Sequence, residues 1–391
     1  MRAIKNVISR LYQWVFQIGG YVIPKNSKTV IFESFLGKQF SDNPKAIYDY
    51  MKINYPHFKL IWSFDKRSFS KYESENLIKV KRFSFKWLYY MNRAKYWVSN
   101  SRLPLWIPKP KGTVYLQTWH GTPLKKLGSD INEIYMPGTN TEKYKRNFLK
   151  EAGKWDYLIS PNAYTTKIFK RAFNFNKNII ETGYPRNDFL INSNNEFNIN
   201  GLKKKIKIPF GKKVILYAPT WRDNQYYEIG RYKFKLELDL DLLRKNLGND
   251  YIIILRLHYL VAENLDLSRY EGFIYDFSHH EDIKELYLMA DLLITDYSSV
   301  FFDYANLKRP MLFYVYDIEE YRDKLRGFYF DFESRAPGPL VRTTSELIDK
   351  IKDIENEMIH TSETFVDFYN QYCYLEDGKA SQRVVHEVFG K

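Results

Sequence analysis

The sequence contains one cysteine, Cys373, among 391 residues. A single cysteine excludes an intrachain disulfide framework and a cluster of thiolate metal ligands, and it fits a reducing compartment. No run of about 18 apolar residues occurs, so the sequence predicts no transmembrane helix. The signatures G-x-G-x-x-G, G-K-[ST] and H-E-x-x-H are absent as well. These absences exclude the common phosphate-loop proteins and the zinc proteases.

Aromatic and basic residues are abundant. Tyrosine (33), phenylalanine (28) and tryptophan (8) make up 18% of the chain, and the formal net charge is +14. Aromatic rings suit cores, sugar-binding clefts and membrane interfaces alike. A basic protein attracts nucleic acid, anionic lipid headgroups or phosphorylated substrates. Because no nucleic-acid-binding motif is present, we expect no nucleic-acid partner.

Residues 1–25 predict an amphipathic helix. Apolar side chains recur there at helical spacing, with basic residues elsewhere on the helical wheel. This pattern is typical of a helix that lies in a membrane interface. A helix packed on its own domain is the alternative. The apolar positions are Ile4, Val7, Ile8, Leu11, Trp14, Val15 and Ile18.

Short β-rich runs alternate with helical patterns along the chain, which indicates βαβ units and parallel sheets. A polar stretch at 192–207 divides this alternation into two series. We therefore expect two domains, residues 26–205 and residues 206–391. The expected strands are 28–33, 59–64, 95–99, 113–118, 156–160, 179–182, 213–217, 251–257, 272–276, 292–295 and 310–315.

Polar residues that directly follow a predicted strand are the candidate site, because ligands bind beyond the carboxyl ends of parallel strands. His120 follows the run 113–118 and precedes a glycine and two lysines. Its imidazole titrates near neutral pH and can serve as a base. Arg222 follows the run 213–217 and can hold a phosphate oxygen through its planar fork, or pair with Asp223 instead.

Two more strand ends carry candidate ligands for phosphate groups. Arg256 and His258 share one face of a predicted strand and suit a pyrophosphate clamp. Ser298 and Ser299 fall where a strand turns into a helix, so their hydroxyl and backbone N–H groups can bind phosphate. Simple helix capping is the alternative for these serines. Asp303, on the same helix, can reach a ribose hydroxyl.

Two patterns look like metal sites but are discounted. His279 and His280 are adjacent, and adjacent residues rarely ligate one ion together. Asp239 and Asp241 form a D-x-D pattern away from any strand end. The sequence therefore predicts no metal site.

Together the strand-end segments resemble the CDP-glycerol glycerophosphotransferase family, the wall teichoic acid polymerases and primases of Gram-positive bacteria. The likeness extends over about residues 117 to 383, and the stretch 32–48 looks like the polyglycerol or ribitol phosphate transferases. The matching motifs are Trp119-His120-Gly121-Thr122, Ala218-Pro219-Thr220-Trp221-Arg222, Arg256-Leu257-His258, Thr295-Asp296-Tyr297-Ser298-Ser299, Pro337-Gly338-Pro339 and Asp377-Gly378-Lys379-Ala380-Ser381-Gln382-Arg383.

The resemblance implies a GT-B-like α/β fold, with two Rossmann-like domains whose parallel sheets face a cleft. Residues 26–205 would bind the acceptor. Residues 206–391 would bind the CDP donor, with a C-terminal helix that packs back on the N-terminal domain. An acceptor hydroxyl would attack the phosphorus next to glycerol in CDP-glycerol and release CMP. The resemblance implies no cofactor and no required metal.

The resemblance also assigns roles to individual residues. His120 would take the proton of the attacking hydroxyl, and His258 would stabilise charge on the pyrophosphate. The implied donor-binding residues are Thr220, Arg222, Arg256, Asp296, Ser298, Ser299, Asp303 and Arg383, and the implied acceptor-binding residues are Gly37, Lys38, Thr122 and Lys125.

The implied acceptor is an undecaprenyl-diphosphate-linked glycan, reached from the cytoplasmic face of the anionic cell membrane by a peripheral enzyme. The oligomeric state stays open. Three alternatives remain: a CDP-ribitol transferase of the same family, a nucleotide-sugar glycosyltransferase of the same fold, and a membrane- or polyanion-binding module without activity.

Overall fold

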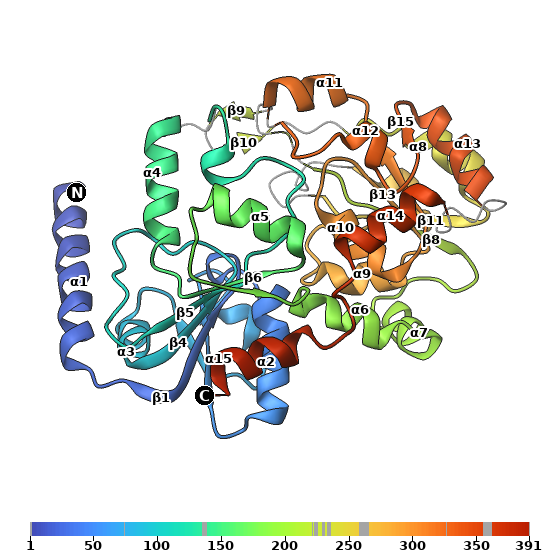
Figure 1. The fold of residues 1–391 in the computed structure, drawn as a ribbon. Helices are drawn as coiled ribbons and strands as arrows, with labels where there is room; N and C mark the ends of the chain where they lie inside the picture. The colour runs from blue at the N-terminus through green and yellow to red at the C-terminus, as the bar shows by residue number, and fades with distance from the viewer. Residues whose placement is uncertain are drawn as a thin grey trace. The chain divides into compact units, whose positions relative to one another are not determined.

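The computed structural model describes residues 2–73, 75–134, 139–220, 222, 226–228, 231–232, 236–257, 266–325, 327–354 and 362–390. The chain forms two compact units (Figure 1). The first unit comprises residues 1–120, 145–188 and 379–391, and the second comprises residues 121–144 and 189–378. The sequence placed one division at residue 206. In the structure the chain instead passes between the units four times, so sequence continuity does not assign the segment 121–144. Residues 379–391 lie in the first unit, on which the resemblance implied that a C-terminal helix packs.

The first unit is built on a seven-stranded parallel sheet in the order β3-β2-β1-β4-β5-β6-β7. One face is covered by α2 (Asp42–Asn54) and α15 (Ala380–Phe389). Their side chains Ile47, Met51 and Val385 pack on Phe32 and Trp62 in the sheet. Strands buried on both faces read as continuous apolar runs, which is why the sequence reveals them. The strands are β1 (Asn26–Glu33), β2 (Lys59–Phe64), β3 (Lys79–Lys81), β4 (Ala94–Ser99), β5 (Val114–Gln117), β6 (Tyr157–Ser160) and β7 (Asn178–Glu181).

The N-terminal helix α1 (Arg2–Val22) packs on α3 (Phe85–Arg93) in this unit (Figure 1). Its Phe16 is fully buried and contacts Trp87 and Trp106 with ring centroids 5.8 and 5.9 Å away. The other helices of the unit are α2 (Asp42–Asn54), most of α4 (Thr141–Ala152), α5 (Ala163–Ala172) and α15 (Ala380–Phe389). Within the described ranges, no helix combines the length and apolarity that crossing a bilayer requires.

The second unit is built on a six-stranded parallel sheet in the order β12-β11-β8-β13-β14-β15. Leu243 of α8 and Leu347 of α13 belong to the apolar core on one face. The strands are β8 (Lys213–Tyr217), β11 (Tyr251–Leu255), β12 (Ile274–Asp276), β13 (Leu292–Thr295), β14 (Met311–Tyr314) and β15 (Leu340–Val341). A short antiparallel pair, β9 (Tyr226–Glu228) and β10 (Arg231–Tyr232), stands apart from this sheet.

The helices of the second unit are α6 (Asp188–Ser193), α7 (Glu196–Lys205), α8 (Leu240–Leu247), α9 (Ile283–Met289), α10 (Val300–Tyr304), α11 (Ile318–Glu320), α12 (Phe332–Arg335), α13 (Thr344–Ile354) and α14 (Glu363–Tyr372). Each of the eleven expected strand runs overlaps a strand of the structure. The predicted fold class, α/β with two Rossmann-like parallel sheets, is thus confirmed. The strands β3, β9, β10 and β15 were not predicted.

Candidate active site

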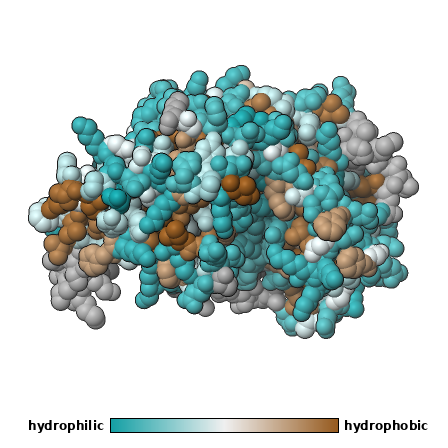
Figure 2. Space-filling view, turned by 90° about the horizontal axis from the view of Figure 1, so that it is seen from below, coloured by the Kyte–Doolittle hydropathy of each residue, from teal (hydrophilic) through white to brown (hydrophobic). Residues whose placement is uncertain are grey.

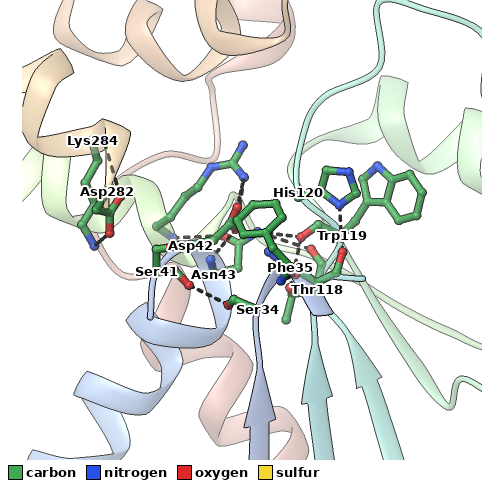
Figure 3. A network of polar contacts seen from close by, with 12 residues as sticks. Ser34, Phe35, Ser41, Asp42, Asn43, Thr118, Trp119, His120, Asp282 and Lys284 are labelled. Carbon is green, nitrogen blue, oxygen red and sulfur yellow. Dashed lines mark hydrogen bonds and ion pairs between the residues drawn. The ribbon is translucent and has the colours of Figure 1, made fainter. Parts of the chain in front are cut away.

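His120 lies just beyond the carboxyl end of β5 in the first unit. The chain leaves the sheet at Trp119, which adopts a left-handed φ of 52°. The Trp119 amide donates to the side-chain oxygen of Gln117 at 3.0 Å, which stabilises this bend. Phe35 and Trp119 flank the His120 ring (Figure 3), with centroids 5.9 and 4.7 Å away.

A backbone carbonyl fixes the tautomer of His120. Its Nδ1 lies 2.8 Å from the carbonyl oxygen of Asn100. Because a carbonyl only accepts hydrogen bonds, Nδ1 carries the proton and Nε2 of the neutral ring is left as an acceptor. Asn100 is held in turn, because its side-chain oxygen accepts from the Phe35 amide at 2.8 Å. This is the geometry that a general base requires.

A buried ion pair stands next to this histidine. Both carboxylate oxygens of Asp42 lie 3.2 Å from one terminal nitrogen of Arg186. Asn43 links the pair to the strand end, since it accepts from the Arg186 amide at 3.1 Å and donates to the Trp119 carbonyl at 3.2 Å (Figure 3).

The surroundings lower the pKa of His120. Desolvation by the surrounding groups is the largest cause, because it disfavours the charged ring, although the residue still has exposed surface. Asp42 and the Asn100 carbonyl oppose this effect, whereas Arg186 and Arg102 add to it. The neutral, proton-accepting form of His120 is therefore favoured.

The predicted acceptor residues of the first unit follow β1. Gly37 ends the short helical turn Phe35–Gly37, with a left-handed φ of 84°. A Cβ at this position would lie 2.6 Å from the Asp65 amide nitrogen, so only glycine fits. Lys38 follows directly. Structural demands therefore account for Gly37 without a ligand.

In the second unit, three strand-end loops meet at Arg222. Its Nε and a terminal nitrogen donate to the two carboxylate oxygens of Asp317, at 2.7 and 2.9 Å. The other terminal nitrogen donates to Asp296 at 2.8 Å and to the Thr220 carbonyl at 2.6 Å. Asp296 also accepts from the Thr220 amide at 2.8 Å. We call Arg222, Asp296 and Asp317 the arginine clamp.

Three tyrosine rings enclose the arginine clamp. Tyr297, Tyr316 and Tyr321 lie 5.2, 5.2 and 5.0 Å from the Arg222 guanidinium. The Tyr297 hydroxyl also donates to Asp317 at 3.0 Å. Burial alone would lower the pKa of Arg222, but the neighbouring carboxylates raise it above its usual value. The guanidinium is therefore permanently charged.

Ser298 and Ser299 follow the clamp residue Asp296 by two and three positions and are half-buried. Ser299 is the N-cap residue of α10, but its hydroxyl makes no capping hydrogen bond. A Cβ added to Gly121 would lie 2.8 Å from the Ser299 hydroxyl, so the backbone passes close to this group. Asp303, predicted to bind ribose, is buried on the five-residue helix α10.

Thr122 and Lys125 were assigned to the N-terminal domain, but the structure places them in the second unit. Thr122 is buried. The Lys125 ammonium donates to the Tyr321 hydroxyl at 3.2 Å, and residue 125 forms a β-bridge with Phe328. The segment after His120 is thus bound to the loops around the arginine clamp.

The remaining predicted residues are scattered. The strand β11 ends at Leu255, so Arg256 lies just beyond the strand and not within it as predicted. Arg256 donates to the backbone carbonyl of Phe277 at 3.2 Å and to that of Ser278. His258 lies outside the described residues.

Arg383 belongs to the first unit rather than to the donor-binding domain. It donates to the hydroxyl and the carbonyl of Thr182, at 2.6 and 2.8 Å. The discounted metal pattern also has a structural explanation, because His280 pairs with Glu285 at 2.9 Å. In the described part of the chain, no three His, Cys, Asp or Glu side chains form a group that could hold a metal ion.

Sequence reasoning missed Asp317, Asn100 and the pair of Asp42 with Arg186. Asp317 lies three residues beyond β14, so the strand-end rule would have selected it. Asn100 directly follows β4 and was open to the same rule. The partnership of Asp42 with Arg186 joins residues 144 positions apart, and no sequence signal announces it.

Two Rossmann-like units, each built on a parallel β-sheet with polar residues beyond its strand ends, define a GT-B-like protein. Residues 16–390 match the CDP-glycerol:poly(glycerophosphate) glycerophosphotransferase family. The chain belongs to this family, and the resemblance drawn from the motifs is confirmed.

Relatives with known names share most of this chain. A teichoic acid poly(glycerol phosphate) polymerase of Bacillus subtilis strain 168 is 62% identical over 383 residues, which cover 98% of this chain but 51% of the relative. The chain thus spans about half the length of that protein. A polymerase of the same name from Bacillus spizizenii W23 is 58% identical over 388 residues, covering 99% of this chain and 98% of the relative.

A teichoic acid glycerol-phosphate transferase of Staphylococcus aureus NCTC 8325 is 47% identical over 390 residues, covering 99% of this chain and 100% of the relative. The solved structure of the wall teichoic acid polymerase TagF is 43% identical, with a TM-score of 0.89. That comparison covers 100% of this chain and 96% of the other.

Proposed function

We propose that this chain transfers glycerol phosphate from CDP-glycerol to a hydroxyl group of a teichoic acid precursor and releases CMP. Membership of the family and the names of its relatives support this substrate pair. The observation that carries the proposal is the geometry of His120, whose Nδ1 proton is bound by a carbonyl so that Nε2 can accept a proton. Solved structures of TagF include variants at two histidines, one soaked with CDPG.

In the proposed reaction, His120 Nε2 takes the proton of the acceptor hydroxyl. The hydroxyl oxygen bonds to the phosphorus next to glycerol, and the bond from that phosphorus to the CMP oxygen breaks. CMP departs with the electron pair. Charge developing on its phosphate is stabilised by hydroxyl and guanidinium donors of the second unit, for which we propose Ser298, Ser299 and Arg256. The charge-stabilising role of His258, which lies outside the described residues, stays a proposal from its motif alone.

The test compares CMP release by the unmodified chain and a His120→Gln variant. Glutamine keeps hydrogen-bonding capacity but is no base, so we expect a loss of at least about a hundredfold in kcat. His57→Gln serves as the matched control, because His57 is exposed before β2, at the opposite end of the sheet. Near-normal turnover by His120→Gln would remove this residue from the mechanism.

The donor and the number of additions need their own assay. The relatives are named for poly(glycerol phosphate) synthesis and for glycerol phosphate transfer, so both one addition and several fit the family. We propose CDP-glycerol as the donor. Assaying CDP-glycerol, CDP-ribitol and UDP-sugars side by side on a synthetic lipid-linked acceptor, with product masses, decides both points. Silence with every donor would favour a binding module without activity.

We further propose that the chain associates peripherally with the cytoplasmic face of the membrane, where a lipid-linked precursor is reached. The face of α1 turned away from Phe16 exposes apolar side chains, including Leu11 at 59% and Trp14 at 61% (Figure 2). Exposed apolar residues on an amphipathic helix suit insertion into a lipid interface. The net charge of +14 favours anionic headgroups.

Sedimentation with phosphatidylglycerol vesicles tests this association. Trp14→Ser and Ile18→Ser each remove apolar area that is exposed, 61% of Trp14 and 38% of Ile18, so we expect weaker binding without loss of fold. Phe197→Ser is the matched control, since Phe197 is 86% exposed on α7 in the second unit. Unchanged binding in the α1 variants would contradict the proposed surface.

A further inference from the structure

We propose that Arg222 is a positioning residue: through the arginine clamp it fixes the strand-end loops of the proposed donor site, and it does not touch the donor. The inference rests on the proposed function, because it concerns the site that would hold CDP-glycerol. It changes the role that the sequence suggested for Arg222, which was direct contact with a phosphate oxygen. The clamp partner Asp317 has no other assigned role.

The hydrogen bonds of Arg222 leave little for a ligand. A guanidinium has five N–H groups, and Arg222 directs four of them into hydrogen bonds with Asp296, Asp317 and the Thr220 carbonyl. Its side chain is 3% exposed. A phosphate oxygen that took more than one hydrogen bond from Arg222 would have to displace a carboxylate or the Thr220 carbonyl, and the carboxylate of Asp317 is held by a well-aligned, two-pronged pair.

The charge balance of the clamp also opposes phosphate binding. One guanidinium faces two carboxylates, so the group carries a net charge of −1. Asp296 is buried as deeply as Arg222, with 2% of its side chain exposed. Few water molecules can screen this charge, and a donor phosphate placed against it would be repelled.

The clamp instead joins three neighbouring strands. Arg222 follows β8, Asp296 follows β13 and Asp317 follows β14, which are adjacent in the sheet. Asp296 holds the Thr220 amide, and the loop from Asp296 continues directly into Ser298 and Ser299. The relative positions of these proposed donor ligands are therefore set by the clamp.

The clamp also reaches the segment that follows His120. Tyr321 stacks on Tyr297 with centroids 4.3 Å apart and accepts a hydrogen bond from Lys125. Tyr329 donates its amide to the Leu124 carbonyl at 2.8 Å. Both contacts lie within the second unit, so the loop 121–130 is anchored to the same framework.

Calorimetric binding of CDP-glycerol and CMP to Arg222→Met, Asp317→Asn and the double variant tests the inference. If Arg222 positions the loops, both single variants weaken CMP binding by about tenfold, the effect of one misplaced charge-assisted hydrogen bond. The double variant is then no weaker than Arg222→Met, because both changes break the same unit. Asp317→Asn keeps the side-chain shape, so folding is retained in at least one variant.

Direct contact between Arg222 and the donor predicts the opposite sign for Asp317. Removing a carboxylate beside a phosphate would leave CMP binding unchanged or tighten it. If Asp317→Asn gives such a result while the unmodified chain still binds CMP, the positioning role of Arg222 is overturned and the proposed function stands. Failure of the unmodified chain to bind CDP-glycerol or CMP would overturn both.

A control separates positioning from loss of stability. Arg309 is a half-buried arginine of the second unit that donates to the backbone carbonyls of Leu288 and Ala290, both at 2.7 Å. Arg309→Met should lower the melting temperature while leaving the CMP dissociation constant unchanged below the transition. If it weakens binding as much as Asp317→Asn does, the effect is general destabilisation and the inference fails.

Discussion

A single added methyl group can test whether Ser299 binds the donor. In Gly121→Ala the new Cβ would lie 2.8 Å from the Ser299 hydroxyl oxygen and 3.4 Å from the Ser299 Cβ. The hydroxyl is the rotatable end of a side chain, so it can turn away while the backbone stays in place. The substitution therefore moves one proposed phosphate ligand and little else.

The structure sets different magnitudes for stability and binding. Displacing the Ser299 hydroxyl from its rotamer costs about 0.5–1.5 kcal/mol. Replacing glycine by alanine recovers about 0.4–1 kcal/mol by restricting the unfolded chain. The free energy of unfolding should therefore change by about 1 kcal/mol or less. A hydrogen bond to a charged phosphate contributes about 1.5–3 kcal/mol, which corresponds to a loss of affinity of about 10- to 150-fold.

Calorimetry with CDP-glycerol on Gly121→Ala, Ser299→Ala and the double variant provides the measurement. The double variant should bind like Ser299→Ala, because the hydroxyl that overlaps the new methyl group is gone. Gly201→Ala on α7 is the matched control, since no atom lies within 4 Å of its added Cβ. Normal affinity in Gly121→Ala, or a further loss in the double variant, would refute Ser299 as a phosphate ligand.

Four further substitutions have effects whose direction follows from the structure. Arg102→Met removes a cation that lowers the pKa of His120, so the acid limb of the kcat/KM profile should move to higher pH. Asp42→Asn removes an anion that raises this pKa, so the same limb should move to lower pH. Shifts of both variants in the same direction would contradict the assignment of this limb to His120. Asp188→Ala removes the acceptor of two amides at the start of α15 and should cost about 1–3 kcal/mol in urea unfolding. Gly338→Ala places a Cβ onto a backbone carbonyl of β14 and should cost about 3 kcal/mol; a normal melting temperature would contradict this geometry.

The strands could be predicted because parallel strands buried on both faces are unbroken apolar runs. The strand β3 has one buried residue, Val80, between two lysines, and β15 comprises two residues. Such edge strands are defined by pairing with a neighbour rather than by their own composition. The sequence therefore carries no run from which they could be recognised.

The candidate site shows a similar division. His120 could be predicted from its position after β5, because strand ends form the ligand-binding edge. Its immediate partner is the backbone carbonyl of Asn100, and a carbonyl group is present in every residue. The location of Lys125 was misjudged for another reason, since the chain enters the second unit directly after His120. Neither the carbonyl contact of His120 nor the point where the chain enters the second unit can be recognised from the types of residue present.

Backbone strain around His120 indicates that the side chains surrounding this residue matter more than backbone stability. Phe35, Asp42 and Trp119 adopt left-handed φ values of 47° to 65°, at about 1–2 kcal/mol for each residue that is not glycine. Glycine would relieve this strain, yet it would remove the two rings that flank His120 and the carboxylate that influences its pKa. Stability alone would therefore select glycine at these positions, whereas the surroundings of the histidine require side chains. That conflict is typical of a functional site, and it supports His120 independently of its place in any motif.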